Sequence, residues 1–132
     1  KCLGKARLAG FFPFRMLHEC VAHLAFGSDW PVVSPDPIAG IRSAVTGLTF
    51  DNKPCLVEQN LSIAEALHAY TSAAATALQC DRLGRIQPGW TGDLVLLDRD
   101  PFDCDWVNGP PRVKMTLAGG KIVHDGRKAH TS

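Results

Sequence analysis

The sequence predicts an α/β protein, and three observations lead to that prediction. Residues 22–27 form a short, almost wholly apolar run that ends at a glycine, which is typical of a buried parallel strand. Two helical patterns follow it, the first from residue 37 to about residue 47 and the second over residues 62–80. From about residue 82 onward, alternating apolar residues and turn-forming dipeptides indicate a β-rich last third.

Composition favours one globular domain. The chain has 132 residues, 45% of them hydrophobic and 20% charged, which is enough for a modest core. Its formal net charge is +1, with scattered basic residues, so nothing indicates a nucleic-acid or anionic-membrane surface. The longest apolar run is too short to span a bilayer, and no signal peptide is visible. Because the chain begins at Lys1, we expect a processed protein, a cloned fragment or a partial reading frame.

The five cysteines are odd in number and widely spaced, with no C-x-x-C pair. A disulfide framework or a thiolate zinc site would need close, paired spacing. We therefore predict free thiols and a cytoplasmic protein. The cysteines are Cys2, Cys20, Cys55, Cys80 and Cys104.

Local signals place the elements of the first half. Residues 14–20 suggest the end of a helix, and Pro31 cannot continue the strand predicted before it. Asp36 is a helix cap with Pro37 in the first turn, and apolar residues spaced by three and four continue that helix to Gly47. Residues 49–59 have no periodicity and suggest an exposed connection.

The most secure element is the helix that starts after Ser62. Ser62 and Glu65 form a capping box, in which each side chain satisfies a free backbone N–H group of the other's residue. Behind it, one apolar stripe is predicted to run along a single helix. The stripe comprises Ile63, Ala66, Leu67, Tyr70, Ala74, Ala77 and Leu78.

The last third is predicted to be strands joined by turns. Pro88-Gly89 forms a turn and residues 93–98 form a strand. Residues 100–111, rich in Pro, Asp and Gly, form a loop. Residues 113–117 alternate, and Gly119-Gly120 can form a two-residue hairpin turn before the chain returns.

Asp29 is the residue that stands out chemically. A carboxylate just past the end of a buried parallel strand lies where barrel enzymes place catalytic groups. An Asp at the end of a strand is, however, more often a turn former or helix cap than a metal ligand. From the pattern alone, the role of turn former or cap is favoured, and that of metal ligand is the alternative.

Several motifs, in order, resemble the amidohydrolase superfamily, specifically its YtcJ-like "amidohydrolase 3" group. The resemblance covers most of residues 11–124. The motifs that carry it are Phe-Pro-Phe-Arg at 12–15, Leu-Ala-Phe-Gly-Ser-Asp-Trp-Pro-Val at 24–32, Ser-Pro-Asp-Pro at 34–37, Leu-Ser-Ile-Ala-Glu-Ala-Leu at 61–67, Tyr-Thr at 70–71, Leu-Gly at 83–84, Pro-Gly at 88–89, Asp-Leu-Val-Leu-Leu-Asp-Arg-Asp-Pro at 93–101 and Gly-Gly-Lys-Ile-Val at 119–123.

The resemblance implies the C-terminal fragment of a (β/α)8 TIM-barrel amidohydrolase, followed by part of a small β-sandwich built from both chain ends. Residues 1–47 would end the barrel, with strand eight and the helix after it. Residues 48–61 would be a connecting loop, 62–80 a helix, and 81–132 the C-terminal share of the sandwich.

The resemblance also gives Asp29 its role, as a ligand of a divalent metal, usually zinc, and as general base toward the metal-bound water. Such an enzyme hydrolyses non-peptide carbon–nitrogen bonds. Ser28 and Trp30 would help shape the substrate pocket, although packing at the barrel mouth explains Trp30 equally well. Cys20 stands where the family commonly has glycine.

One carboxylate does not complete such a site, because catalytic zinc takes about three protein ligands. The family supplies the others from a His-x-His pair on the first strand, a mid-barrel Lys or Glu, and histidines on strands five and six. A whole barrel takes roughly 200 to 250 residues, so these segments lie outside this chain. The five histidines show no H-x-H or H-x₃-H spacing. We therefore expect no turnover and no tightly bound metal in this chain alone.

Two other functional classes remain open. The chain could be a non-catalytic interaction or regulatory module derived from the same fold, associating with itself through an exposed barrel edge. It could also be a small Cys/His metal-binding module, for which the spacing gives little support. We expect a small-molecule substrate for the intact protein, and no nucleic-acid or membrane partner.

Overall fold

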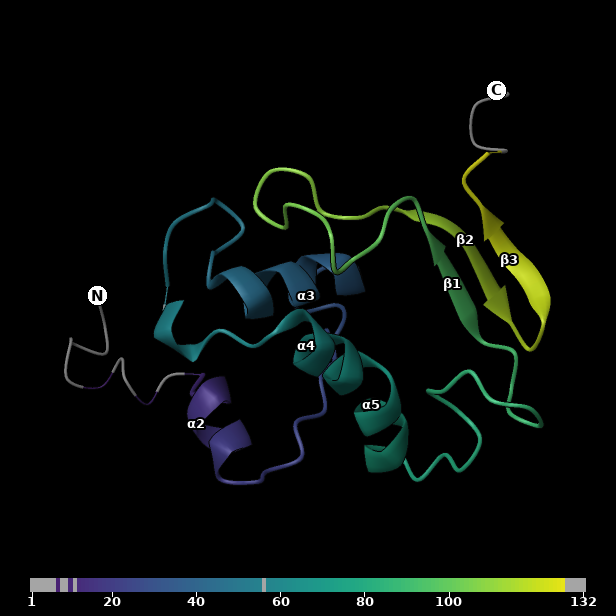
Figure 1. Cartoon of the computed structure of the whole chain (residues 1–132), viewed down its shortest axis with the longest axis horizontal. Helices are drawn as coiled ribbons and strands as arrows, with labels where there is room; N and C mark the ends of the chain where they lie inside the picture. Colours follow the sequence, from purple (N-terminus) through teal and green to yellow (C-terminus); the bar gives the residue numbers. More distant parts are fainter. Residues whose placement is uncertain (1–6, 8–9, 11, 56, 128–132) are drawn as a thin grey trace.

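A computed structural model describes residues 7, 10, 12–55 and 57–127. The free-thiol prediction for Cys2 and the polar tail at 128–132 lie outside the described residues. The elements in chain order are α2 (Phe14–Glu19), α3 (Pro37–Thr46), the short 3-10 helix η1 (Val57–Gln59), α4 (Ile63–Tyr70), α5 (Ser72–Ala77), β1 (Leu94–Leu97), β2 (Val113–Ala118) and β3 (Lys121–Asp125). Figure 1 shows the helices gathered in one part of the molecule and the sheet beside them.

Both predicted helix starts are confirmed. The Asp36 side chain accepts a hydrogen bond from the Ile38 N–H at 2.9 Å, and Pro37 occupies the first turn of α3. α3 ends at Gly47, whose φ of 65° is left-handed. A Cβ there would lie 2.8 Å from the Val57 Cα, so the approach of η1 also requires glycine. The capping box of Ser62 with its partner three residues later opens α4.

The single helix predicted over residues 62–80 is wrong, because α4 and α5 are separated at Thr71. Thr71 has φ −120° and ψ −95°, and its hydroxyl donates to the carbonyl of Leu67 at 2.7 Å. Gly84 passes so close that a Cβ on it would lie 2.7 Å from the Ser72 Cα. The interruption shifts the apolar stripe, so Leu78, expected on the buried face, is 75% exposed.

The strand predicted over residues 22–27 is not formed either. The segment is nevertheless two-sided, because its side chains are half-buried at positions 22, 24 and 26 and exposed at 23, 25 and 27. The Phe26 N–H donates to the carbonyl of Ala69, at the end of α4, at 3.0 Å. A parallel strand needs a hydrogen-bonded neighbour strand, and the part of the chain that the structure describes places none beside it.

The predicted β-rich last third is confirmed as a three-stranded antiparallel sheet in the order β1-β2-β3. Ala118 pairs with Lys121, so Gly119 and Gly120, with φ of 57° and 76°, make the predicted two-residue turn. The Gly120 N–H donates to the carbonyl of Gly92 at 2.9 Å, and a Cβ on Gly92 would lie 3.1 Å from that nitrogen. The second layer of a sandwich does not occur within the described ranges.

The core lies between α3, α4 and the loop that joins β1 to β2, and its buried cluster comprises Ile41, Ala44, Leu61, Ala66 and Trp106. Trp106 comes from the loop, is 6% exposed and donates from Nε1 to the carbonyl of Pro101 at 2.8 Å. Arg42 of α3 donates to the Trp106 carbonyl at 3.0 Å. This loop, which crosses above α3 in Figure 1, therefore attaches the sheet to the helices.

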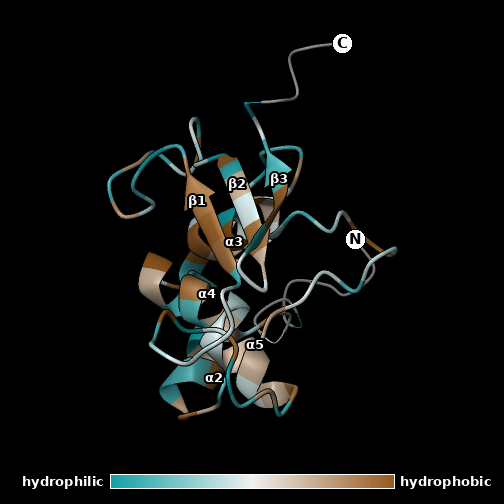
Figure 2. Cartoon of the chain, turned by 90° about the vertical axis from the view of Figure 1, so that its right-hand side faces the viewer, coloured by the Kyte–Doolittle hydropathy of each residue, from teal (hydrophilic) through white to brown (hydrophobic). Residues whose placement is uncertain are grey.

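The apolar side chains of the sheet are less well covered. Val95, Leu96, Ile122 and Val123 are each more than half exposed. Figure 2 shows β1 in the hydrophobic colour along its length. Cys20, Cys55, Cys80 and Cys104 are free thiols, as predicted. None of the helices in the described ranges has the length and hydropathy needed to cross a membrane.

Candidate functional site

Asp29 lies in the loop between the extended segment 22–27 and α3, and its side chain is exposed. Its φ of 51° is left-handed, a conformation that aspartate and asparagine adopt more readily than most residues. Its carbonyl oxygen accepts a hydrogen bond from the Val32 N–H at 2.9 Å. Asp29 is therefore a turn residue whose carboxylate is accessible, so the two roles left open by the sequence are compatible.

The two residues beside Asp29 differ in exposure. Ser28 is half-buried, whereas Trp30 is 67% exposed and precedes a cis peptide bond to Pro31. Packing of the Trp30 ring within this chain therefore covers only part of it.

The start of the extended segment is fixed to the end of α2. The Val21 N–H donates to the carbonyl of His18, and the Ala22 N–H to that of Leu17, both at 3.0 Å. Val21 has φ 60°, and this pair of bonds is the Schellman ending of a helix, in which the left-handed residue is usually glycine. The position that favours glycine is thus Val21 and not Cys20, whose φ is −80°.

The end of the segment is fixed by aromatic packing. The Phe26 ring centroid lies 4.9 Å from that of Phe14 on α2 and 5.5 Å from that of Tyr70 on α4. Gly40 lets α3 approach α4 on the other side of Tyr70's ring, because a Cβ on Gly40 would overlap the Tyr70 hydroxyl. The segment that leads to Asp29 is therefore held between α2 and α4.

A polar network joins the same two helices. Arg15 donates from Nη1 and Nη2 to Glu65 Oε1 and Oε2 at 3.1 and 2.9 Å. It also donates from Nε and Nη2 to the carbonyl of Asn60 at 3.1 and 2.7 Å. His18 Nε2 lies 3.0 Å from Glu65 Oε1, and the Ser62 N–H donates to Glu65 Oε2 at 2.6 Å. We call these five residues the Arg15 network.

Two members of the Arg15 network, Arg15 and Glu65, are charged at neutral pH. Hydrogen bonding from Arg15, with smaller contributions from Ser62, lowers the pKa of Glu65 to about 2. The hydrogen bond to Glu65 raises the pKa of Arg15. Both side chains are half-buried, so this is a bidentate pair that solvent still reaches in part.

The described residues do not by themselves make a metal site. Within the described ranges, no three His, Cys, Asp or Glu side chains come together where they could hold a metal ion. His68 lies against the Ser72 hydroxyl, with 2.7 Å between Nδ1 and Oγ, and His18 belongs to the Arg15 network. Asp29 offers one hard oxygen donor of the kind divalent metals accept, and a catalytic zinc site needs further ligands. The Cys/His metal-module hypothesis gains no support from this part of the chain.

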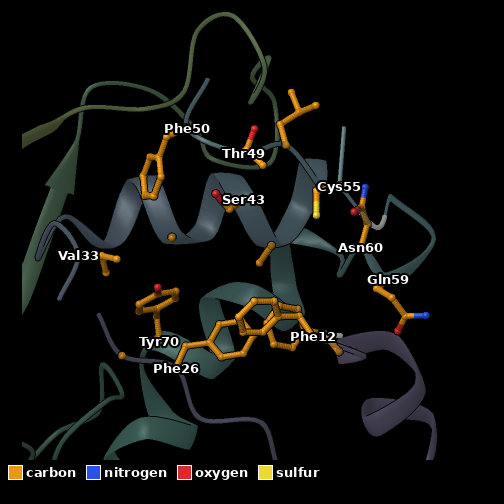
Figure 3. Close-up of a pocket in the computed structure, with 16 residues that line it drawn as sticks. Phe12, Phe26, Val33, Ser43, Thr49, Phe50, Cys55, Gln59, Asn60 and Tyr70 are labelled. Carbon is orange, nitrogen blue, oxygen red and sulfur yellow. The ribbon is translucent and has the colours of Figure 1, made fainter. Parts of the chain in front are cut away.

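The principal cavity lies next to this loop and was not predicted from the sequence. It has a volume of about 490 Å³ and apolar walls, with Phe12, Phe26 and Tyr70 on one side and Phe50 and Val33 on the other (Figure 3). Gly27 lines it, but Ser28, Asp29 and Trp30 do not. Four separate stretches of the chain build it, so no local pattern marks it.

Comparison with known proteins gives a consistent family. The model of the amidohydrolase family matches residues 1–124. The chain is 30% identical over 133 residues to the putative amidohydrolase YtcJ of Bacillus subtilis (strain 168), covering 93% of this chain and 24% of that protein. It is 35% identical over 128 residues to the protein LONG AFTER FAR-RED 3 of Arabidopsis thaliana, covering 94% of this chain and 22% of that protein.

Two further similarities bear on chemistry. The chain is 31% identical over 94 residues to the N-substituted formamide deformylase of Arthrobacter pascens, covering 70% of this chain and 17% of that protein. A crystal structure of an uncharacterized metal-dependent hydrolase from Pyrococcus horikoshii OT3 superposes with a TM-score of 0.68 and 31% identity, over 80% of this chain and 22% of the hydrolase. The chain thus spans less than a quarter of the length of these proteins.

Proposed function

This chain belongs to the amidohydrolase family, and on that premise we propose that the intact protein is a metal-dependent hydrolase of non-peptide carbon–nitrogen bonds in small molecules. The observation that carries the proposal is the family match over residues 1–124, a range that includes the Asp29 loop. The likeness to a metal-dependent hydrolase and to a formamide deformylase supports both the divalent metal and the bond type. We propose zinc as the metal.

In this proposal Asp29 is the general base and a metal ligand. A bound divalent metal would lower the pKa of a coordinated water to about 7. The Asp29 carboxylate accepts the proton from the attacking water and returns it to the leaving nitrogen. Its exposure and its place at the end of a held segment suit that role. Ser28 and Trp30, on either side, would contact the substrate.

The proposed architecture explains why residues 22–27 have two kinds of side-chain environment. A barrel strand packs one face against surrounding helices, and Phe26, on the half-buried face of this segment, packs against Phe14 of α2 and Tyr70 of α4. Its other face and its backbone edges would meet the rest of a (β/α)8 barrel. The β1-β2-β3 sheet would be the C-terminal share of the β-sandwich, with its exposed apolar residues covered by the other share.

The chain alone is proposed to be inactive. Since the residues that the structure describes bring no three potential ligands together, Asp29 would lack the partners that hold a catalytic metal. Neither turnover nor tight metal binding is expected from residues 1–132 in isolation.

The specific test replaces Asp29 with Asn in the intact protein, because asparagine keeps the shape and tolerates the φ of 51°. We expect Asp29→Asn to lower kcat for an N-substituted formamide at least about 100-fold, the range for loss of a general base. The same change at exposed Asp81 is the matched control and should leave kcat unchanged. Full activity of Asp29→Asn would refute the assigned role.

A second candidate is a non-catalytic interaction or regulatory module. It is favoured by the unpaired extended segment 22–27 and by the exposed apolar residues of the sheet, which could associate with a second copy. Sedimentation velocity of the 132-residue chain over a hundredfold concentration range tests it. A species that stays monomeric throughout would remove this candidate.

A further inference from the structure

We propose that Arg15 is a positioning residue for the Asp29 site, acting through the Arg15 network to hold α2, and with it the segment that ends at Asp29, against α4. This inference rests on the function proposed above, since it concerns the same carboxylate. Arg15 itself lies fourteen positions before Asp29, and it donates hydrogen bonds to Glu65 and Asn60.

Helix α2 needs an attachment to the rest of the protein. It has six residues and none of them is buried, and a helix this short is not stable by itself. Phe14 packs at the margin of the core, and the N-cap residue, Pro13, offers no side-chain cap, so the first-turn N–H of Met16 donates instead to Gln59 Oε1 at 3.3 Å. Arg15 supplies four hydrogen bonds to residues at the start of α4 and just before it, so the network fixes α2 in place.

Helix α2 and the extended segment 22–27 are joined directly to each other. The Schellman bonds, from Val21 to His18 and from Ala22 to Leu17, leave no flexible linker between them. His18 is itself a member of the Arg15 network. A rotation of α2 would therefore move the beginning of the segment.

Both ends of the segment are attached to the same helix, α4. Glu65, in the first turn of α4, holds α2 through Arg15, and Ala69, in the last turn, accepts the Phe26 N–H. α4 thus fixes the segment at two places about one turn apart. Without the Arg15 hydrogen bonds, the α2 end keeps the His18 contact to Glu65, the Phe26 end keeps its backbone bond to Ala69, and the loop with Asp29 follows three residues later.

The geometry requires arginine specifically. The guanidinium reaches two oxygens of Glu65 and the Asn60 carbonyl at once, which its planar set of donors allows. A lysine ammonium would keep the charge but not this set of directions. Arg15→Lys therefore tests orientation while leaving the charge, and most of the side chain, in place.

The experiment uses the intact protein with 5-fluorotryptophan incorporated and its ¹⁹F resonances assigned by Trp→Phe changes. Trp30 adjoins Asp29 and reports on the loop, whereas Trp90 and Trp106 lie elsewhere and serve as internal references. Arg15→Lys and Glu65→Gln are expected to shift or broaden the Trp30 resonance and leave the other two unchanged. Turnover of an N-substituted formamide is measured in parallel.

We expect Arg15→Lys to lower kcat about 10- to 100-fold with KM within about twofold, because displacement of a catalytic group affects the chemical step more than substrate binding. Arg99→Lys is the matched control, since Arg99 also donates from two nitrogens, Nε and Nη2, to one carboxylate, that of Asp98 just after β1. It should change neither kcat nor the Trp30 resonance.

Two outcomes separate this inference from the proposed function. If folded Arg15→Lys and Glu65→Gln proteins keep the wild-type Trp30 resonance and kcat, the positioning role is wrong even when Asp29→Asn is inactive. If Asp29→Asn is fully active, the role that the proposed function gives to Asp29 fails, and a Trp30 resonance that moves in Arg15→Lys still supports the structural link. Equal broadening of all three tryptophan resonances would indicate a general loss of structure and would overturn the positioning role.

Discussion

The helical region, residues 12–78, and the sheet region, residues 82–127, use their apolar side chains differently. In the helical region α3 and α4 bury theirs against each other, and Ala66 is fully buried. In the sheet region Val95 is 56% exposed and Ile122 57% exposed. An antiparallel sheet needs a second layer over its apolar face, so the helical region is nearly self-sufficient whereas the sheet region is not.

The difference indicates where the chain depends on material beyond itself. The sheet region sends one large anchor, Trp106, into the helical core, and otherwise presents an uncovered apolar surface. The exposed side of segment 22–27 is a second uncovered place. Both are expected of a chain that spans less than a quarter of the length of its relatives.

The largest predicted effect is that of Trp106→Ala, which breaks the link between the two regions. Loss of the buried ring should reduce the free energy of unfolding by about 3 to 5 kcal/mol. Urea unfolding of the 132-residue chain, followed by circular dichroism, measures it. Phe102→Ala is the control, because Phe102 lies in the same loop but is 62% exposed. Equal losses in both variants would show that Trp106 is no special anchor.

A smaller effect is predicted where the two regions meet at Gly84. Gly84 and Gly89 have φ of 80° and 81°, but only Gly84 has neighbours, with Ser72 Cα at 2.7 Å from the position of a Cβ. Gly84→Ala should cost about 2 to 3 kcal/mol, because steric overlap adds to backbone strain. Gly89→Ala should cost about 1 kcal/mol from strain alone. Differential scanning calorimetry of both variants gives the difference, and equal melting temperatures would contradict the close approach.

The smallest predicted effect sharpens the comparison inside the helical region. Val21→Gly should stabilise the chain by about 1 kcal/mol, because a β-branched residue now occupies the left-handed position of the Schellman ending. Cys20→Gly should give no such gain, since Cys20 already has a φ of −80°. Thermal unfolding of the pair decides the matter, and a gain from Cys20→Gly alone would reverse the assignment.

Signals that act within four or five residues were predictable from the sequence. The cap at Asp36, the capping box at Ser62 and the hairpin at Gly119-Gly120 each depend on side chain and backbone groups close in the chain. The structure has all three at the predicted places.

Features that depend on distant contacts could not be predicted in the same way. Residues 22–27 have the composition of a strand, but a strand also requires a neighbour. The break at Thr71 coincides with the approach of Gly84, thirteen positions away. Trp106 lies in a segment that was predicted only as a loop, and its burial follows from the position of α3.

The same distinction between local and distant contacts applies to the candidate site. The place of Asp29 after an apolar segment was predictable, and its family role follows from motifs around it. The Arg15 network was not predicted, although Arg15 and Glu65 both lie in motifs of the family, because their contact spans fifty positions. The apolar cavity beside Gly27 is likewise assembled from separate stretches of chain.

The left-handed backbone at Asp29 has a consequence for how this protein can change over evolutionary time. Asparagine and glycine are the replacements that this φ of 51° accepts best, and each is one nucleotide away from an aspartate codon. Either mutation would remove the carboxylate while leaving the turn intact. If Asp29 has the catalytic role proposed above, its loss would therefore carry almost no penalty in folding. Descendants that have become inactive by this route would be expected to persist as well-folded proteins, free to acquire binding roles.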